Sequence, residues 1–257
     1  MKLSKVLAIP GKTRMNFSTP HQTLFILALA AVAATAHADM KDEFVVNTRF
    51  DSDAIVYLNR GNDLLEKGDS RGAQTNFEAA IRAGPNMWPA YLNRAQIYAR
   101  QDKWEFALQD CNAAMRLRPG FFRTAILRAS VNLHLGHDRA SLADLNSVIA
   151  LHADDETDAL ALSHRGWLRV LSADPSVYSP KEALTDARLA CRLNYWKKAS
   201  YIDGLAAACA ATGDFDAAVR YEEQAIKSGK FSAEELKDAQ ARLALYSRHH
   251  RVPRASR

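Results

Sequence analysis

A period of 34 residues constrains the fold of this chain more strongly than any other feature. The segment Tyr57-Leu58-Asn59-Arg60-Gly61 is followed 34 residues later by Tyr91-Leu92-Asn93-Arg94-Ala95. The same offset relates small residues and proline further along the two copies: Ala73 to Ala107, Ala80 to Ala114, and Pro85 to Pro119. Such a fixed period indicates one supersecondary unit that is stacked on copies of itself.

The repeated unit resembles the tetratricopeptide repeat (TPR) family. It shares the length of 34 residues, a small residue at position 8, alanine at positions 20 and 27, and proline at position 32. The resemblance covers about residues 54–247. It implies an all-α, right-handed superhelical solenoid in which the first helix of each helix-turn-helix repeat lines a concave face. Asn194-Tyr195-Trp196-Lys197, ahead of Gly213-Asp214-Phe215, also resembles the C-terminal unit of a group of bacterial secreted TPR proteins.

The period predicts about five repeats and a C-terminal capping helix. The repeats lie near 54–87, 88–121, 122–155, 159–197 and 199–232, and the cap helix is predicted at 232–247. In the fourth repeat the turn-rich segment 172–179 delays the second helix, which we expect from Pro180 to Leu193. Ser232 followed by Glu235 predicts a capping box at the start of the cap helix. This helix should cover the open end of the stack.

Residues 1–38 have the pattern of a secretory signal peptide. Four basic residues precede the apolar run 24–33, and Ala36-His37-Ala38 forms an A-x-A cleavage pattern before Asp39. The alternative is a membrane anchor, but the largely apolar run 23–36 is shorter than the roughly 20 residues that a spanning helix needs. We therefore expect a bacterial periplasmic protein with no membrane span in the mature chain. Translation starts at Met1 or at Met15, and residues 39–53 are expected to form a linker.

The positive charge of the chain is concentrated at its two ends. Of the 34 Lys and Arg residues, four precede residue 39 and four lie in a basic tail at 248–257. The segment 39–247 therefore has 26 basic and 29 acidic residues, a net charge of −3. This balance predicts no nucleic-acid partner. The basic tail is expected to be solvated and mobile.

Arginine recurs at position 7 of four repeats, and aspartate recurs at position 23 of three. In the fifth repeat both are replaced, by Leu205 and Tyr221. Because the two residues disappear together, we predict a structural ladder of ion pairs between the two helices of a repeat. The alternative is an anion-binding groove lined by the arginines. The predicted pairs are Arg94–Asp110, Arg128–Asp144 and Arg165–Asp186.

The concave face that the TPR resemblance implies is the predicted peptide-binding groove. It would present an apolar row flanked by amides, which both donate to and accept from a peptide backbone. The predicted groove residues are Leu58, Asn59, Asn62, Leu92, Asn93, Gln96, Arg123, Ile126, Leu127 and Ser130. The alternative is that the leucines seal contacts between repeats.

The groove resembles the carboxylate clamp of some TPR domains only in part. Asn62, Asn93 and Arg123 match that clamp, but Leu58 and Leu127 stand where two of its cations belong. We therefore do not expect a ligand with a C-terminal carboxylate. A polyproline-type peptide advances about 9 Å per turn, close to the 8–10 Å spacing of packed helices. This match favours an extended ligand with an apolar residue at every third position.

Cysteine and histidine residues give weaker indications. Cys111 lies at a core position. Cys191 and Cys209 lie on helices that should face each other, so the sequence leaves undecided whether they form a disulfide. His134 and His137 are three residues apart near a turn, and no third metal ligand accompanies them. We expect two exposed turn histidines; a metal site is the alternative. We expect no metal and no cofactor.

The sequence contains none of the common enzyme motifs, such as GxSxG, HExxH, a P-loop or CxxC. The first hypothesis is a non-enzymatic scaffold that binds a protein or an extended peptide in its groove. The second is a structural accessory subunit of an envelope complex that uses its convex face and cap helix. The third is a hydrolase with a site in the segment 172–179, for which the sequence offers no nucleophile and base.

Overall fold

A computed structural model of the protein describes residues 50–254. The predicted signal peptide 1–38, linker residues 39–49 and the tail end 255–257 lie outside the described residues. Between residues 50 and 254 the chain forms eleven α-helices and no strand. The expected all-α class is therefore confirmed.

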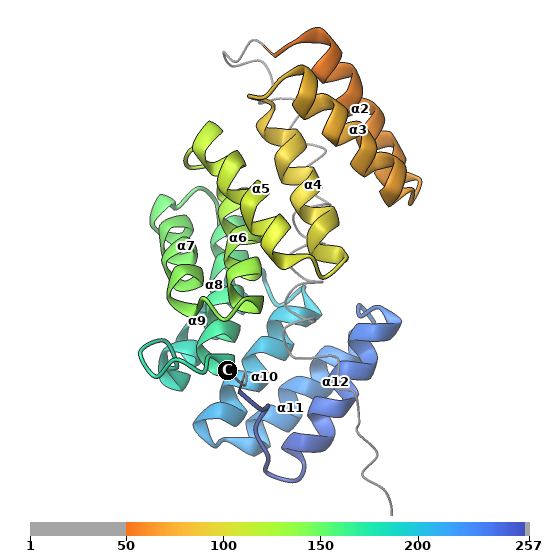
Figure 1. Ribbon diagram of the computed structural model, residues 1–257. Coiled ribbons are helices and arrows are strands. Elements are labelled where there is room, and N and C mark those ends of the chain that lie inside the picture. Colours follow the sequence, from red (N-terminus) through yellow and green to blue (C-terminus); the bar gives the residue numbers. More distant parts are fainter. Residues whose placement is uncertain (1–49, 255–257) are drawn as a thin grey trace, which may run out of the picture.

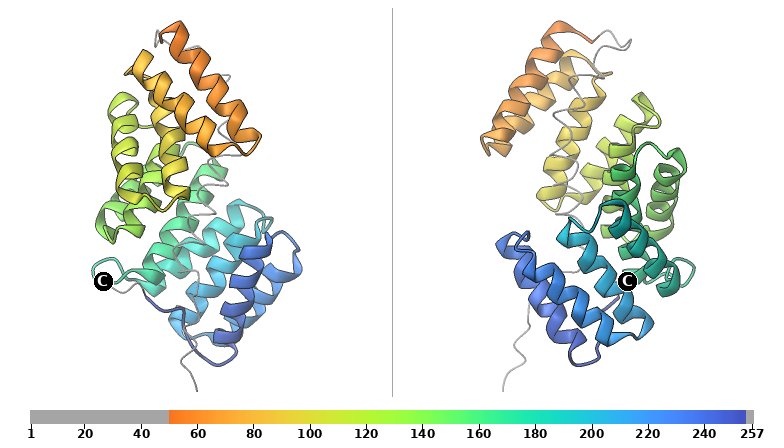
Figure 2. Two further views of the ribbon diagram at one scale, coloured as in Figure 1. Left: turned by 45° about the vertical axis from the view of Figure 1, so that its right-hand side comes forward. Right: turned by 180° about the vertical axis from the view of Figure 1, so that it is seen from behind.

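The helices form five consecutive antiparallel pairs and a final single helix. The helices follow a curved path from the pair α2–α3 at one end to the pair α10–α11 and the single helix α12 at the other (Figures 1 and 2). The first helices of the repeats are α2 (Ser52–Glu66), α4 (Trp88–Arg100), α6 (Phe122–His134), α8 (Asp155–Leu171) and α10 (Ala199–Thr212). The second helices are α3 (Ser70–Ala83), α5 (Trp104–Leu117), α7 (Asp138–Leu151), α9 (Pro180–Leu193) and α11 (Phe215–Lys227), and α12 (Ala233–Tyr246) follows. This is a superhelical solenoid of helix-turn-helix repeats.

The turn between the two helices of a repeat has one recurring backbone feature. Position 15 of each regular repeat has a positive φ, and it is occupied by Gly68, Asp102, Gly136 and Gly213. Glycine adopts this conformation without steric cost, and aspartate adopts it more readily than most residues. The turn therefore reverses the chain at the same place in each repeat and fixes the length of the first helix.

The caps of several helices follow from single residues. Asp69 and Asp214 each accept a hydrogen bond from a backbone N–H in the first turn of the following helix. Ser232 and Glu235 form both hydrogen bonds of a capping box at the start of α12. The capping box that the sequence predicts is therefore confirmed.

The fourth repeat departs from the regular period at both ends of α8. This helix begins at Asp155, before the expected start near residue 159, because Asp154 caps it with its side chain. The inserted segment after α8 is anchored to α7. Ser172 donates a hydrogen bond to Asp138, and Arg139 forms an ion pair with Asp174 at 2.9 Å. The insertion therefore fills the junction between the third and fourth repeats.

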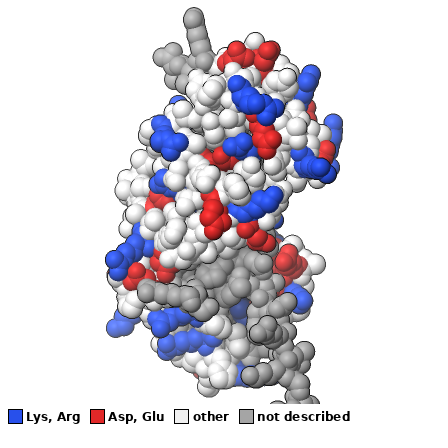
Figure 3. Space-filling view, viewed as in Figure 1, with Lys and Arg blue, Asp and Glu red and all other residues white. Residues whose placement is uncertain are grey.

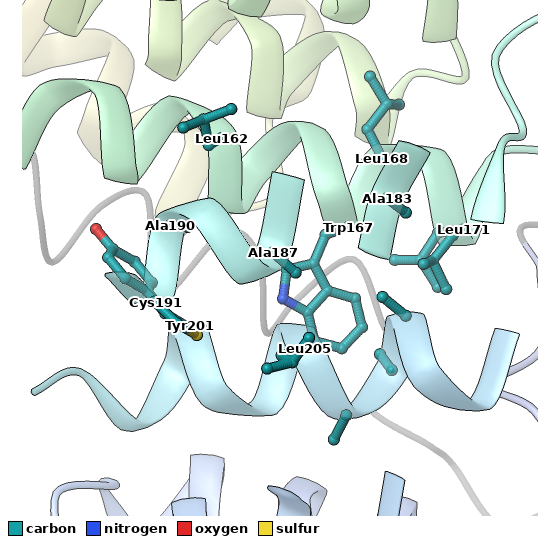
Figure 4. Packing of buried hydrophobic residues seen from close by; sticks show 14 of the residues in the cluster. Leu162, Trp167, Leu168, Leu171, Ala183, Ala187, Ala190, Cys191, Tyr201 and Leu205 are labelled. Atoms are coloured by element: carbon teal, nitrogen blue, oxygen red, sulfur yellow. The ribbon is translucent and has the colours of Figure 1, made fainter. Parts of the chain in front are cut away.

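The largest hydrophobic cluster joins repeats three to five with the C-terminal residues. Trp167 of α8 lies at its centre, between α9 and α10, with Ala187 and Leu205 beside its ring (Figure 4). A Cβ atom at Gly204 would stand 2.9 Å from the indole nitrogen of Trp167. Glycine at this position lets α10 approach the ring, which seals the fourth repeat against the fifth.

The sequence predicts a solvated, mobile tail, and its described residues 248–254 are exposed except for Val252, which packs on the repeats. Val252 is only 7% exposed and belongs to the largest cluster. His249 stacks on Phe215 of α11, and the guanidinium of Arg254 lies 4.5 Å from the ring centre of Tyr178 in the insertion. The apolar contact of Val252 and these two ring contacts hold residues 248–254 against repeats four and five.

Within residues 50–254, every helix is too short or too polar to cross a membrane.

Candidate functional site

The apolar residues predicted for the groove are part of the hydrophobic core. Leu58 packs in one cluster with Ala90 and Ile97 of the second repeat. Leu92 packs with Leu127 of the third repeat in the next cluster, and Leu92 is only 1% exposed. Ile126 belongs to the cluster that includes the fourth repeat. These four side chains therefore seal successive repeats together, which is the alternative that the sequence left open.

The amide residues of the predicted groove lie on α2 and α4. Asn93 donates a hydrogen bond to the side chain of Asn62 over 2.8 Å, which joins the first two repeats. Asn59 is exposed. Gln96 is only 5% exposed, and its Nε2 has no hydrogen-bond partner among residues 50–254. A buried amide without an acceptor is rare in folded proteins, so Gln96 is the residue of this face that most needs an explanation.

The two remaining groove residues lie on α6. Arg123 is buried, and its guanidinium carbon lies 5.5 Å from the ring centre of Phe122. Ser130 donates its hydroxyl hydrogen to the backbone carbonyl of Ile126. The hydroxyl of Ser130 is thus used within its own helix.

The three ion pairs of the predicted ladder are all present. Each arginine donates two hydrogen bonds to its aspartate, through Nε and one terminal nitrogen, over 2.6–3.0 Å. The acids Asp110, Asp144 and Asp186 are buried. Burial raises the pKa of Asp110, and the hydrogen bond from Arg94 opposes that rise. Such paired arginines tie the helices of one repeat together and are not free to bind an anion.

Two asparagines that the sequence reasoning missed extend this ladder between repeats. Arg128 donates a third hydrogen bond to Asn112 over 2.9 Å, and Arg165 donates one to Asn146 over 2.7 Å. Each asparagine lies on the second helix of the preceding repeat. The two are 34 residues apart, so the period itself contained the signal. Arg60 has no such role, because it is exposed and forms no ion pair with a described residue.

The fifth repeat replaces the ladder with a buried charge cluster. Asp203 of α10, Glu222 of α11 and Arg242 of α12 are all buried. Burial raises the pKa of Glu222 well above its usual range, and the nearby carboxylate of Asp203 adds to that rise. Arg242 also lies 5.7 Å from the ring centre of Trp167. The cluster therefore attaches the cap helix to the last repeat.

The histidine and cysteine residues form no site within the described chain. His134 stacks on Trp104 with ring centres 4.0 Å apart. No group of three metal-ligating side chains occurs in residues 50–254. All three cysteines are free and buried, and burial raises the pKa of Cys191 to about 12 and that of Cys209 to about 11. Buried thiols with such pKa values are unreactive at neutral pH.

Lys and Arg side chains alternate with Asp and Glu side chains on the face shown in Figure 3. The described residues of this face therefore provide no continuous surface of one sign. This distribution agrees with the balanced charge of the repeats and gives no support to a nucleic-acid partner.

Comparison with known proteins identifies the repeated unit. Residues 58–120 match the family model described as tetratricopeptide repeat. Human sperm-associated antigen 1 is 31% identical over 104 residues, which are 40% of this chain and 11% of that protein. The chain thus spans only about a tenth of the length of this curated relative.

Solved structures with low sequence identity share the fold. MamA from Desulfovibrio magneticus RS-1 is 17% identical and has a TM-score of 0.59, over 71% of this chain and 98% of MamA. YrrB, described as a TPR protein with an unusual peptide-binding site, is 16% identical and has a TM-score of 0.52, over 74% of this chain and 91% of YrrB. The 34-residue period, the matched family model and the solenoid of helix pairs identify the chain as a tetratricopeptide repeat protein.

Proposed function

We propose that the protein is a non-enzymatic scaffold that binds an extended segment of a partner protein on the face formed by α2, α4 and α6. The fold supports this proposal because TPR solenoids are protein-interaction modules and YrrB is described as having a peptide-binding site. The partner would lie along the amides of the first helices rather than on an apolar row, because the leucines there are core residues.

Gln96 is the observation that carries the proposal. Its buried Nε2 lacks an acceptor, and a backbone carbonyl of a bound segment would supply one once the side chain turns outward. An unsatisfied buried amide costs about 1–3 kcal/mol. A ligand that satisfies it gains this energy on binding, which makes the amide a suitable point of recognition.

The substitution Gln96→Leu tests the proposal because leucine has a similar size and no polar atoms. The variant should be at least as stable as the wild type, since it removes an unpaired buried amide. It should also lose affinity for the partner. Partners captured from envelope extract by the wild-type protein would be identified by mass spectrometry, and their binding to both proteins would then be measured.

Gln109→Leu is the matched control, because Gln109 is exposed on the second helix α5. This variant should bind the captured partner with the affinity of the wild type. Equal binding by Gln96→Leu, Gln109→Leu and the wild type would show that the binding surface lies elsewhere.

We also propose that the mature protein is periplasmic and begins at Asp39. The basic residues, apolar run and A-x-A pattern of residues 1–38 support this location. Cell fractionation and N-terminal sequencing test it. Recovery of a chain that retains the run 24–33 would instead indicate a tethered scaffold.

A further inference from the structure

The turn that connects α9 to α10 exposes two consecutive aromatic side chains. Tyr195 is 73% exposed and Trp196 is 40% exposed. In contrast, Trp88 and Trp167 are buried. Tyrosine and tryptophan are enriched at protein interfaces, where they bury a large area at a small entropic cost. We call residues Asn194–Lys198 the aromatic turn.

The aromatic turn has an unusual backbone. Tyr195 has a φ of 53° and Trp196 a φ of 58°, both in the left-handed region. Aromatic residues rarely adopt this conformation, because their Cβ atom crowds the following carbonyl oxygen. Four hydrogen bonds from the N–H groups of residues 195–198 hold it. The two shortest run from Trp196 N–H to the carbonyl of Cys191, over 2.8 Å, and from Lys198 N–H to Oδ1 of Asn194, over 2.7 Å. Glycine would serve the turn better, so folding alone does not account for Tyr195.

The neighbouring helix fixes the orientation of Trp196. Its ring stacks on Tyr221 of α11, with centres 6.0 Å apart and planes 23° apart. Tyr195 lies beside Lys197, whose Nζ is 5.3 Å from the ring centre. The side chain of Trp196 is therefore held in place before any partner arrives, which lowers the entropic cost of binding.

Positive charges surround the aromatic turn without acidic partners. Arg192, Lys197 and Lys230 are exposed, and none forms an ion pair with a described residue. The Nζ of Lys230 donates a hydrogen bond to the carbonyl of Lys197 over 2.8 Å, which brings it to the turn. Only Lys198 is paired, with Glu156 at 3.3 Å.

We propose that the aromatic turn, together with Lys230 and Tyr221, is a docking surface for an acidic segment of a partner protein. Carboxylates of that segment complement the three unpaired cations, and its apolar groups cover Tyr195 and Trp196. The surface is formed by the end of α9, the turn before α10, Tyr221 of α11 and the turn after α11, whereas the proposed groove lies on α2, α4 and α6. The two surfaces are thus independent, and one partner does not exclude another.

Fluorescence anisotropy of the full-length protein with a fluorescein-labelled copolymer of glutamate and tyrosine tests the proposal. The wild type should bind this probe, binding should weaken as salt increases, and the probe should protect Trp196 from acrylamide quenching. Tyr195→Gly is the sharpest variant, because glycine relieves the left-handed backbone. It should raise the midpoint of thermal unfolding and yet lower the affinity for the probe about tenfold or more, the loss typical of an aromatic anchor.

Lys197→Glu provides a second variant that leaves the aromatic side chains unchanged and should also abolish binding. Phe106→Ala is the matched control, because Phe106 is an exposed aromatic residue on α5 that lies outside the turn. The control should bind the probe with the affinity of the wild type. The proposal is overturned if the wild type does not bind the copolymer or if Tyr195→Gly and Lys197→Glu bind it unchanged. Binding of phosphatidylglycerol vesicles in place of the copolymer would overturn it as well.

Discussion

Arg242 donates two hydrogen bonds to Asp203, over 2.8 and 2.9 Å, and so joins the cap helix to the last repeat. The second carboxyl group of this cluster, Glu222, lies 3.4 Å from the same guanidinium nitrogen Nε. One buried cation thus faces two buried acids. The cluster is electrically balanced only while Glu222 holds its proton, which agrees with the raised pKa of this carboxyl group.

The variant Glu222→Gln should be more stable than the wild type at neutral pH. The folded-state pKa of Glu222 lies well above its usual value of 4.5. The stability linked to its proton is therefore complete below that value and is lost as the pH rises through the folded-state pKa. Glutamine keeps the shape and does not ionise. Denaturant unfolding from pH 4.5 to pH 8 should show a growing advantage of the variant; parallel curves would contradict a protonated Glu222.

His164 should make the protein sensitive to acid. Burial lowers its pKa to about 4, and the charge of Lys198 acts in the same direction. The folded-state pKa thus lies below the unfolded value of about 6.5. Stability linked to neutral His164 is complete above pH 6.5 and is lost as the pH falls towards 4, by about 3 kcal/mol in total.

The variant His164→Leu should remove this loss. Ionisation of Glu222 changes the stability in the opposite direction above pH 4.5. The proteins with His and with Leu at position 164 are therefore best compared in a Glu222→Gln background. If the proteins with and without His164 lose the same stability at acid pH, another group causes that loss.

Removal of Asp144 should destabilise the fold without affecting the proposed groove. Asp144 accepts two hydrogen bonds from Arg128 and one from Asn132 over 3.3 Å. Asp144→Ala should cost about 2–3 kcal/mol, because it leaves a partly buried guanidinium without its partner. As a control, Glu156→Ala breaks an exposed ion pair with Lys198 and should cost less than about 1 kcal/mol. Ligand affinity per folded molecule should stay unchanged, and a selective loss of affinity would place the arginines in the groove.

Gly61→Ala should be destabilising because of one neighbour. A Cβ atom at Gly61 would overlap the ring of Phe77 on α3. Overpacking of this kind costs about 1–3 kcal/mol. The third repeat has Ala129 and Leu145 at the equivalent positions, so the double variant Gly61→Ala with Phe77→Leu should recover much of the loss. Thermal unfolding of the single and double variants measures this coupling; additive effects would mean that the two positions are independent.

The features that follow the 34-residue period could be predicted from the sequence. The solenoid and the pairing of Arg94 with Asp110 both depend on residues at fixed positions of the repeat. The cluster of Asp203, Glu222 and Arg242 could not be predicted, since Arg242 lies on the cap helix, 39 residues from Asp203 and outside any repeat. The sequence contains no second copy of the cap helix with which Arg242 could be compared.

The groove was only partly predictable for a different reason. Position 5 of a first helix lies where the concave face meets the next repeat, so the pattern alone does not decide between ligand contact and core packing. Leu58 and Leu92 are core residues because the small side chains Ala90 and Ala95 let the helices approach. Val252 was missed because one apolar residue in a basic segment has no periodicity.

The hydrogen bond between Asn62 and Asn93 has a consequence for local unfolding. Both of its partners are neutral. In contrast, a charged arginine donates the hydrogen bond that joins the second repeat to the third and the one that joins the third to the fourth. In a solenoid each repeat is stabilised mainly by its neighbours, and the terminal repeat has only one neighbour. The first repeat is therefore held by a neutral polar contact and by one interface. Amide hydrogens of α2 and α3 should exchange with solvent before those of α6 to α9, so that the solenoid opens from its amino-terminal end.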